Sequence, residues 1–308
     1  MTCSIIIVNY NTKQLLDDLL QSIVIYLTDV TFEVIIIDNA SSDESHKLFE
    51  KYNDKFKLKW IQNSANYGFA RANNQGIVVA RGNILLLLNS DTLLIDDSLN
   101  KIFNAFEKDT RYSIVGCQLL NSDLSIQQSC GLRPNLQTEF LNKLMIDRLL
   151  IKLGLSTGLK YSRKQLQTTR EPDWVTGAFL MMKKDVISQI GLLDEQIHMF
   201  YEDIDFCVRA KNIGLKIQYN PLARILHFHG GSWKKWRAKS IVDDAESCLY
   251  FHRKHSGLLT VAIVRFLLIL QNSFRLLYLF ATITKTNSTE IQAKRKGYWE
   301  ALKVSFKK

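Results

Sequence analysis

Short apolar runs alternate with longer amphipathic segments over the first hundred residues of the chain. Three runs are rich in β-branched residues or leucine, too short to cross a membrane, and followed by polar residues: Ile5 to Val8, Val34 to Ile37 and Ile84 to Leu88. Such runs are typical of strands that are buried on both faces of a parallel sheet. Helix-length segments lie between or after them, roughly at Leu15 to Leu27, Ser45 to Tyr52 and Ala70 to Ala80. The pattern therefore predicts an α/β fold with a doubly wound sheet.

Each predicted strand ends in polar residues. Asn9 and Tyr10 follow the first strand, Asp38 follows the second, and Asn89 and Asp91 follow the third. Ligands of doubly wound sheets bind beyond the carboxyl ends of the strands, so we expect these side chains to line one crevice. The Asp91 carboxylate could hold a hard cation there, although strand ends often carry Asn, Ser and Asp simply to make a turn. Asp38 could accept a hydrogen bond from a nucleobase or a ribose hydroxyl, or it could cap a loop.

A glycine and an arginine open the helix predicted after the second strand. Gly68 precedes the helix, and Arg71 lies one turn into it. This arrangement suits the binding of an anion at a helix N-terminus. Gly68 could equally serve only to permit the turn.

Three carboxylates stand within four residues at the predicted start of a later helix, at Glu202, Asp203 and Asp205. Acidic residues favour helix N-termini, which explains one or two of them but not three. Asp205 and Arg209 are four residues apart and can pair on a helix. Glu202 and Asp203 are then left to project towards a site.

Two further segments carry residues typical of binding sites. Trp174, Thr176 and Gly177 offer an aromatic face and a glycine that permits close approach, as a sugar site would need, or they belong to the core. His227 and His229 end an apolar strand and point to the same side of it, because alternate residues share a face. One histidine could complete a metal site, and the alternative is a surface group.

The order and spacing of these segments resemble the family 2 glycosyltransferases of the GT-A fold, in particular the rhamnosyltransferase-like branch that acts in surface polysaccharide assembly. The resemblance covers about Ser4 to Trp233. It rests on seven motifs in the same order: Ser4 to Asn11, Ile37 to Asp43, Asn66 to Gly76, Leu88 to Asp91, Thr176 to Ala178, Glu202 to Asp203 and His227 to Ser232. The resemblance implies that Asp38, Asn9 and Tyr10 hold the nucleoside of a nucleotide diphosphate sugar, with Gly68 and Arg71 nearby.

The resemblance also implies a divalent cation, Mg²⁺ or Mn²⁺. Asn89 stands where the family's first metal-motif aspartate is usual, so Asp91 must carry more of the metal binding, and His227 falls at the position of a further ligand. Asp203 is expected to take the proton from the acceptor hydroxyl, in one displacement that inverts the anomeric centre. Glu202 is expected to position the acceptor or the base.

Composition and charge narrow the possible partners. A chain of 308 residues that is 46% hydrophobic can bury one large α/β core. Its net charge of +10 attracts nucleic acid, acidic membranes or phosphorylated substrates. No nucleic-acid-reading module is recognisable and much of the basic excess lies in the tail, so we expect no nucleic-acid partner. Five scattered cysteines without a C-x-x-C pair and a first strand without a basic leader predict a reduced, cytoplasmic protein.

We expect residues 1–255 to form the GT-A catalytic domain, with a mobile helical insertion at 132–171, and residues 256–308 to form a helical tail that associates with membranes. Leu258 to Thr284 is strongly apolar but contains Arg265, Gln271, Asn272 and Arg275, which fall in an arc of roughly 120° on a helix. This pattern is typical of a helix lying in the membrane interface, and the alternative is a helix packed on the catalytic domain. Six cationic residues near the end would meet anionic lipid: Lys294, Arg295, Lys296, Lys303, Lys307 and Lys308.

The sequence therefore predicts an inverting glycosyltransferase, peripheral on the inner face of the cell membrane. The leading donors are dTDP-rhamnose and a UDP-hexose, and the expected acceptor is a hydroxyl of a lipid-linked glycan. A nucleotidyltransferase would need a glycine-rich phosphate loop after the first strand, and Asn9 to Thr12 does not supply one. A noncatalytic carbohydrate-binding or scaffold protein stays the alternative.

Overall fold

The computed structural model describes residues 2–153, 161–228, 237–282 and 289–306. Its main feature in these ranges is a mixed eight-stranded sheet, ordered β3-β2-β1-β4-β9-β6-β10-β5. The strands are β1 (Cys3–Asn9), β2 (Phe32–Asp38), β3 (Lys57–Gln62), β4 (Ile84–Asn89), β5 (Thr92–Leu94), β6 (Ile114–Leu120), β9 (Phe179–Lys183) and β10 (Ile217–His227), and β7 (Cys130–Gly131) pairs with β8 (Trp174–Val175) in a separate ribbon. The helices are α1 (Lys13–Tyr26), α2 (Leu48–Tyr52), α3 (Phe69–Val79), α4 (Ser98–Lys108), α5 (Leu136–Lys143), α6 (Ile146–Lys152), α7 (Asp185–Ile190), α8 (Glu202–Asn212), α9 (Arg237–His255), α10 (Leu258–Thr282) and α11 (Thr289–Phe306).

The three strands predicted from the apolar runs are parallel neighbours in this sheet, and β3 extends them at the edge as a fourth parallel strand. β1 lies between β2 and β4 and is parallel to both, with Asn9 beside Asp38 and Val8 beside Asn89. Their polar ends are therefore neighbours, as the doubly wound pattern predicted. The sheet becomes mixed because β9 is antiparallel to both β4 and β6.

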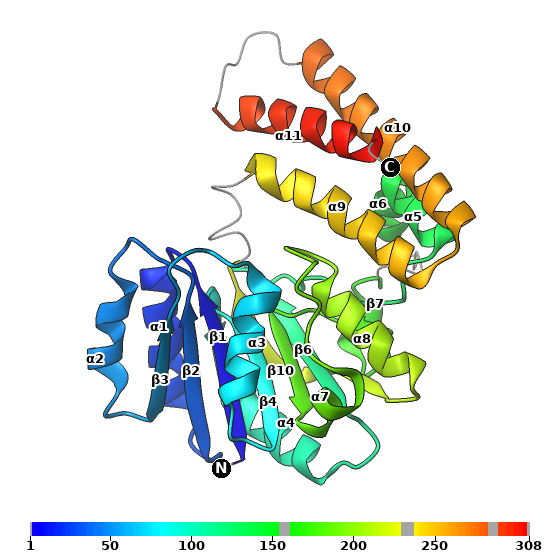
Figure 1. Cartoon of the computed structure of the whole chain (residues 1–308). Helices are drawn as coiled ribbons and strands as arrows, with labels where there is room; N and C mark the ends of the chain where they lie inside the picture. Colours follow the sequence, from blue (N-terminus) through cyan, green and yellow to red (C-terminus); the bar gives the residue numbers. More distant parts are fainter. Residues whose placement is uncertain (1, 154–160, 229–236, 283–288, 307–308) are drawn as a thin grey trace.

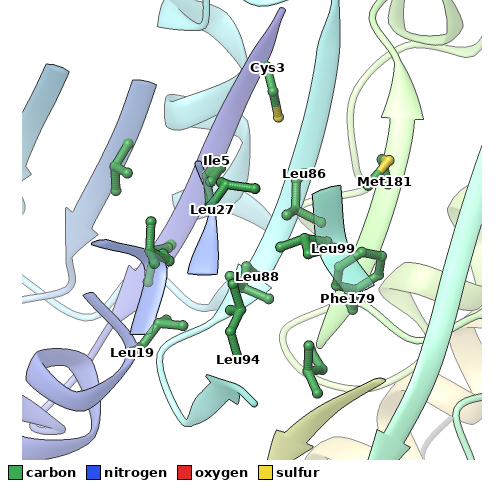
Figure 2. Close-up of a cluster of buried hydrophobic side chains, with 14 of the residues drawn as sticks. Cys3, Ile5, Leu19, Leu27, Leu86, Leu88, Leu94, Leu99, Phe179 and Met181 are labelled. Atoms are coloured by element: carbon green, nitrogen blue, oxygen red, sulfur yellow. The ribbon is translucent and has the colours of Figure 1, made fainter. Parts of the chain in front are cut away.

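The strands are continuously apolar because both faces of the sheet are covered. Ile5 belongs to a cluster with residues of α1 and α4, shown in Figure 2 with Leu19, Leu86 and Phe179. Ile6 faces the other way, into a second cluster that includes residues of α3 and α8. At Gly76 a Cβ atom would lie 2.5 Å from the Ile6 side chain, so α3 approaches the sheet more closely than any other residue would allow.

A second group of helices, α5, α9, α10 and α11, packs together and is called the helical layer below. Figure 1 shows this layer on the side of the sheet towards which β1 runs from the N-terminus. Its apolar contacts join Cys248 and Phe251 of α9, Val264 of α10 and Ala301 of α11 to Tyr201 at the start of α8. The predicted boundary at residue 255 falls between α9 and α10, which lie in the same layer.

Within the predicted insertion at 132–171, the structure places α5, α6 and a 3-10 turn at Gln165–Gln167. An Asn135–Thr138 capping box starts α5, which fixes the first turn of that helix. Glu139 and Lys143 of α5 are buried against the rest of the protein. The mobility of this segment stays a prediction.

The predicted polar side of α10 faces the protein in the structure and not the solvent. Gln271 and Asn272 are buried inside the helical layer instead of facing water, and Arg275 lies over the ring of Tyr298 of α11 at 5.3 Å. The apolar side of α10 is the one that is exposed. The residues at least two-fifths exposed on this apolar face are Leu258, Leu259, Phe266, Leu270, Phe274, Leu277, Tyr278 and Phe280.

Candidate active site

Two residues predicted to hold the nucleoside, Asn9 and Asp38, lie side by side at the ends of β1 and β2. Asn9 Nδ2 donates a hydrogen bond to Asp38 Oδ2 at 2.7 Å. Asp38 Oδ1 accepts from the Ser41 backbone N–H at 2.7 Å and from Gln62 Nε2 at 2.8 Å. Each carboxylate oxygen can accept about two hydrogen bonds, so Oδ2 keeps capacity for one ligand donor. Asp38 thus shapes the loop, and because its side chain is buried, its contact with a nucleoside stays a prediction.

Three other residues are predicted to bind the sugar donor, namely Gly68, Arg71 and Tyr10, and their placements differ. Gly68 has φ +84°, a conformation that favours glycine, and its carbonyl accepts a hydrogen bond from Asn39 Nδ2 at 3.3 Å. Arg71 is half-exposed, lies over the Tyr67 ring at 4.3 Å and has Nε 4.0 Å from a carboxylate oxygen of Glu195. None of these described contacts joins Arg71 to the ends of β1, β2 or β4. Tyr10 follows Asn9 and is partly exposed.

The two predicted metal ligands lie together although they are far apart in the sequence. His227 Nε2, at the end of β10, is 3.3 Å from Asp91 Oδ1 in the turn after β4. The Phe228 backbone N–H donates to the Asp91 carbonyl oxygen at 2.9 Å, which fixes the two segments side by side. Asn89 Nδ2 is 3.5 Å from the same His227 nitrogen. A cation with bonds of about 2.1 Å fits between a carboxylate oxygen and an imidazole nitrogen at this spacing.

Gln127 orients His227 and was missed by the sequence analysis. Its Oε1 lies 2.9 Å from His227 Nδ1, and its Nε2 donates to the His227 carbonyl oxygen at 2.6 Å and to Asn121 Oδ1 at 2.7 Å. Because Nε2 of Gln127 is the donor in both of those contacts, Oε1 accepts from Nδ1–H of the histidine. The Nε2 lone pair of His227 then faces Asp91, as a metal ligand requires. Gln127 lies in a loop 100 residues from His227, and no local pattern marks it.

The predicted acid pair opens α8. Asp203 Oδ2 accepts from the Gly177 backbone N–H at 2.8 Å, and Asp203 Oδ1 accepts from the Ile204 backbone N–H at 2.8 Å. Glu202 is buried, and its Oε2 has no hydrogen-bond partner among the described residues. Burial raises the pKa of both carboxyl groups, and the Asp203 charge raises that of Glu202 further. A carboxylate whose pKa is raised from its usual value is better matched to proton abstraction near neutral pH.

Backbone contacts connect the acid pair to the metal-ligand turn. The Asn89 N–H donates to the Ala178 carbonyl oxygen at 3.1 Å, and the neighbouring Gly177 N–H is the donor to Asp203. A Cβ atom at Gly177 would lie 3.1 Å from the Phe69 ring at the start of α3. The end of β4, the start of α3 and the start of α8 therefore meet around Gly177.

The remaining predicted residues of the site have mixed placements. The Thr176 side chain hydrogen-bonds Asp203, which lowers the pKa of that carboxyl against the larger effect of burial. Trp174 Nε1 donates to the Leu132 carbonyl oxygen at 2.9 Å, and its ring packs on the second core cluster, which favours the core alternative. His229 lies outside the described residues.

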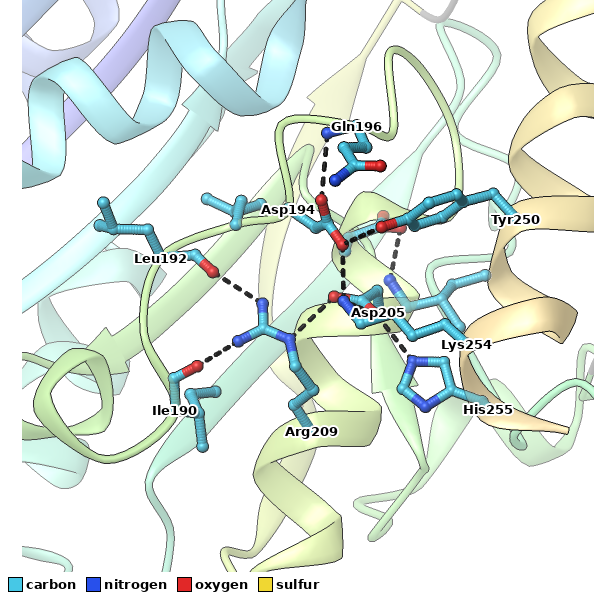
Figure 3. Close-up of polar contacts among 12 residues, drawn as sticks. Ile190, Leu192, Asp194, Gln196, Asp205, Arg209, Tyr250, Lys254 and His255 are labelled. Atoms are coloured by element: carbon cyan, nitrogen blue, oxygen red, sulfur yellow. Dashed lines mark hydrogen bonds and ion pairs between the residues drawn. The ribbon is translucent and has the colours of Figure 1, made fainter.

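A network of ion pairs joins α8 to α9 behind this site (Figure 3). Asp205 accepts from Arg209 Nε at 2.8 Å, which confirms their predicted pairing. It also lies 2.9 Å from Lys254 Nζ and 2.7 Å from His255 Nε2. Burial alone would raise the pKa of Asp205, but these three partners hold it at about 2. Lys254 continues the network to Asp194 at 2.6 Å.

The sequence model of glycosyl transferase family 2 matches residues 4–190. The chain belongs to glycosyl transferase family 2. The match covers β1 to β9 and the turn that holds Asp91, and it confirms the family that the seven motifs indicated. It does not distinguish the rhamnosyltransferase-like branch from others.

Two relatives of this chain carry names that refer to the synthesis of glycans. The chain is 25% identical over 229 residues, 73% of its length, to the low-salt glycan biosynthesis hexosyltransferase Agl10 of Haloferax volcanii. It is 24% identical over 230 residues, also 73% of this chain, to the poly-beta-1,6-N-acetyl-D-glucosamine synthase of Staphylococcus aureus. The alignments span 66% and 50% of those relatives' own lengths.

Solved structures share its architecture. The mannosyltransferase PcManGT of Pyrobaculum calidifontis, in complex with GDP-Man and Mn²⁺, matches with a TM-score of 0.56 at 14% identity, covering 98% of this chain and 86% of that one. At this identity the likeness shows the fold alone. The GT-A fold of the chain, a mixed sheet flanked by helices, is therefore confirmed.

Proposed function

We propose that this chain is an inverting hexosyltransferase that moves a sugar from a nucleotide diphosphate to a hydroxyl of a lipid-linked glycan. The observation that carries the proposal is the continuous set of contacts from the Asp91–His227 pair through Asn89 and Gly177 to Asp203. It joins two possible ligands of a divalent cation to the partly buried carboxylate of Asp203. The names of Agl10 and of the PcManGT complex with GDP-Man and Mn²⁺ support the hexosyl donor and the metal.

The side chains divide the chemistry between leaving group and nucleophile. Asp91 and His227 would hold Mg²⁺ or Mn²⁺, and such an ion would neutralise the charge that develops on the leaving nucleoside diphosphate. Asp203 takes the proton of the acceptor hydroxyl while that oxygen attacks the anomeric carbon, and the bond to the phosphate breaks on the opposite face. Glu202, whose pKa is raised by burial, stays protonated more readily and positions the acceptor or Asp203. One displacement of this kind inverts the anomeric centre.

Two experiments test the catalytic base and identify the sugar donor. Asp203→Asn keeps the side-chain shape and removes the base, so turnover should fall by ~10² to 10⁴ while nucleotide-sugar binding stays. Thermal unfolding with a panel that includes dTDP-rhamnose and UDP-hexoses identifies the donor, because a bound donor stabilises the fold. If Asp203→Asn retains most of its turnover with saturating metal and donor, Glu202 becomes the base, and the role of Asp203 is wrong.

We further propose that the apolar face of α10 binds the cytoplasmic surface of the membrane. By length and composition, α10 is the one helix of the described residues that could cross a bilayer. Spanning is disfavoured because α10 packs along α9 and α11, which carry many charged residues. Lying in the interface would cover Phe266 and Phe274, now 57% and 66% exposed, and would leave the packing of the layer intact. Exposed Lys296 and Lys303 of α11 would meet anionic headgroups.

Surface variants test this membrane contact better than truncation, because removing α10 would expose Phe251 and other apolar residues of α9. Phe266→Ser with Phe274→Ser should reduce sedimentation with anionic vesicles and keep activity on a soluble acceptor. Val78→Ser on α3, also exposed, is the matched control and should sediment like the unmodified chain. Unchanged sedimentation of the double variant, or no sedimentation of the unmodified chain at low salt, would remove the membrane from the proposal.

A further inference from the structure

A buried carboxylate of the helical layer contacts the residue just before the acid pair. Glu139 of α5 is fully buried, and its Oε1 accepts a hydrogen bond from Tyr201 Oη at 3.0 Å. Its Oε2 has no hydrogen-bond partner in the part of the chain that the structure describes, but lies 3.6 Å from Lys143 Nζ. His252 Nε2 of α9 is 3.4 Å from Oε1. Burial alone would raise the pKa of Glu139, but Lys143 and His252 hold it at about 2. Tyr201 therefore donates to an ionised acceptor, which makes a stronger hydrogen bond than a neutral one.

The same tyrosine lies in an unfavourable backbone turn. Phe200 and Tyr201 have φ values of +64° and +63°, the left-handed region that favours glycine. This conformation is unfavourable for residues with a side chain and persists only where surrounding contacts hold it. The Tyr201 carbonyl then accepts from the Asp205 N–H at 2.7 Å and begins α8. The turn therefore sets the direction in which the next two residues, Glu202 and Asp203, leave the backbone.

The side chain of Tyr201 ties this turn to the helical layer, in addition to a hydrogen bond from Ser247 Oγ of α9 to the Met199 carbonyl oxygen at 2.8 Å. Its ring packs on Phe251 of α9 with centroids 5.5 Å apart, and its hydroxyl reaches Glu139 of α5. On the other side, Gly177 holds the Asp203 carboxylate through a single backbone N–H. Asp203 is thus fixed from two directions, by the sheet through Gly177 and by the helical layer through Tyr201.

We propose that Glu139 and the Tyr201 hydroxyl are positioning groups for the catalytic base, through which the helical layer fixes the place of Asp203 beside the acceptor. The inference rests on the proposed role of Asp203. It gives α5 and α9 a part in turnover although neither carries a residue assigned to donor, metal or proton transfer.

A metal site at the same place fits less well. Glu139, Cys248 and His252 offer ligand atoms within 4.8 Å of one another. The Lys143 ammonium already faces the Glu139 carboxylate, and a second cation beside it would be repelled. Tyr201 and His252 also already contact Oε1 of that carboxylate.

The test compares two variants, each of which removes one tyrosine hydroxyl that donates to a carboxylate. Tyr201→Phe keeps the ring and loses the hydrogen bond to Glu139. Tyr250→Phe is the control, because Tyr250 Oη of α9 also donates to a carboxylate, that of Asp194, at 3.0 Å, and this hydrogen bond does not involve Glu202 or Asp203. We expect Tyr201→Phe to lower kcat by about 10- to 100-fold, since a small displacement of a reacting group has effects of that size. Its donor KM and donor Kd should not change, and Tyr250→Phe should keep kcat.

A double-variant cycle shows whether Tyr201 acts through Asp203. In the Asp203→Asn background, Tyr201→Phe should cause no further loss of kcat, because the group that it positions is gone. A kcat for Tyr201→Phe equal to that of Tyr250→Phe overturns the inference, as does a loss that persists in the Asp203→Asn background. Failure of the proposed function is distinct, because Asp203→Asn alone would then keep its turnover.

Discussion

The sheet and its boundary with the helical layer are held together by different forces. The sheet is covered on both faces by apolar residues such as Ile5, Ile6 and Leu86. The boundary buries charged groups as well, among them Glu139 and Asp205. Apolar burial is non-directional and tolerates small shifts, whereas a buried ion pair is stable only at one geometry and with both partners present. The part of the molecule that sets the direction of Asp203 is thus the part with the stricter geometry.

Two substitutions that lower the free energy of unfolding by similar amounts distinguish these forces, and theirs are the largest stability effects that we predict. Leu86→Ala should lower the free energy of unfolding by about 2 to 5 kcal/mol, through lost burial and a cavity. Asp205→Asn should cost about 3 kcal/mol at neutral pH, the lower end for a broken buried ion pair, because Arg209 and Lys254 keep some access to water. Denaturant unfolding at pH 7 measures both.

The two variants should respond differently to acid. The pKa of Asp205 is lowered to about 2, so its ionised form stabilises the fold above its ordinary pKa of 3.8, and this contribution is lost as the pH falls towards 2. The deficit of Asp205→Asn should therefore shrink between about pH 4 and pH 2, while that of Leu86→Ala stays constant. A deficit of Asp205→Asn that is independent of pH would mean that the network contributes shape and not charge.

The next prediction concerns a single polar contact beside the sheet, between Gln127 and His227 at the end of β10. Gln127→Leu should weaken Mn²⁺ binding about 10- to 100-fold, the usual effect of losing a group that orients a ligand histidine. Gln128→Leu is the matched control, since the neighbouring Gln128 donates to the Cys130 carbonyl oxygen and not to His227. Titration calorimetry with Mn²⁺ and a nucleoside diphosphate measures the affinity without turnover. Equal affinities of the two variants would contradict the role of Gln127, and no binding by the unmodified chain would contradict the metal site.

The sequence predicted the parallel strands β1, β2 and β4 well because burial on both faces leaves continuous apolar runs. It missed β3, where exposed Lys57 and Lys59 alternate with partly buried residues at the sheet edge. It brought Asp91 and His227 together only through the resemblance, since local periodicity does not show contacts 136 residues apart. Gln127 and Glu139 could not be found, because a buried polar contact between distant segments leaves no periodic signal.

The helical layer is a second case in which local periodicity does not predict the structure. Periodicity groups the polar residues on one side of α10, but it does not say which side of a helix faces the protein. Gln271 and Asn272 face inward because other helices cover them. The placement of an amphipathic helix thus depends on neighbours that the local sequence does not show.

The smallest predicted effect is a gain in stability at the acid pair. Glu202 is buried with Oε2 unpaired among the described residues, and burial together with the Asp203 charge raises its pKa well above the ordinary 4.5. For a carboxyl group with a raised pKa, the stability of the protonated form is fully present below pH 4.5 and is lost as the pH rises through the folded-state pKa. Glu202→Gln imitates the protonated form at every pH. Its Tm should match the unmodified chain below pH 4.5 and exceed it increasingly towards pH 8, while Glu107→Gln on the exposed side of α4 should change the Tm at neither pH. A Tm of Glu202→Gln that falls below that of the unmodified chain at pH 8 would show that the Glu202 charge is stabilised in the fold, and the comparison between an apolar sheet and a charged boundary would then extend into the active site.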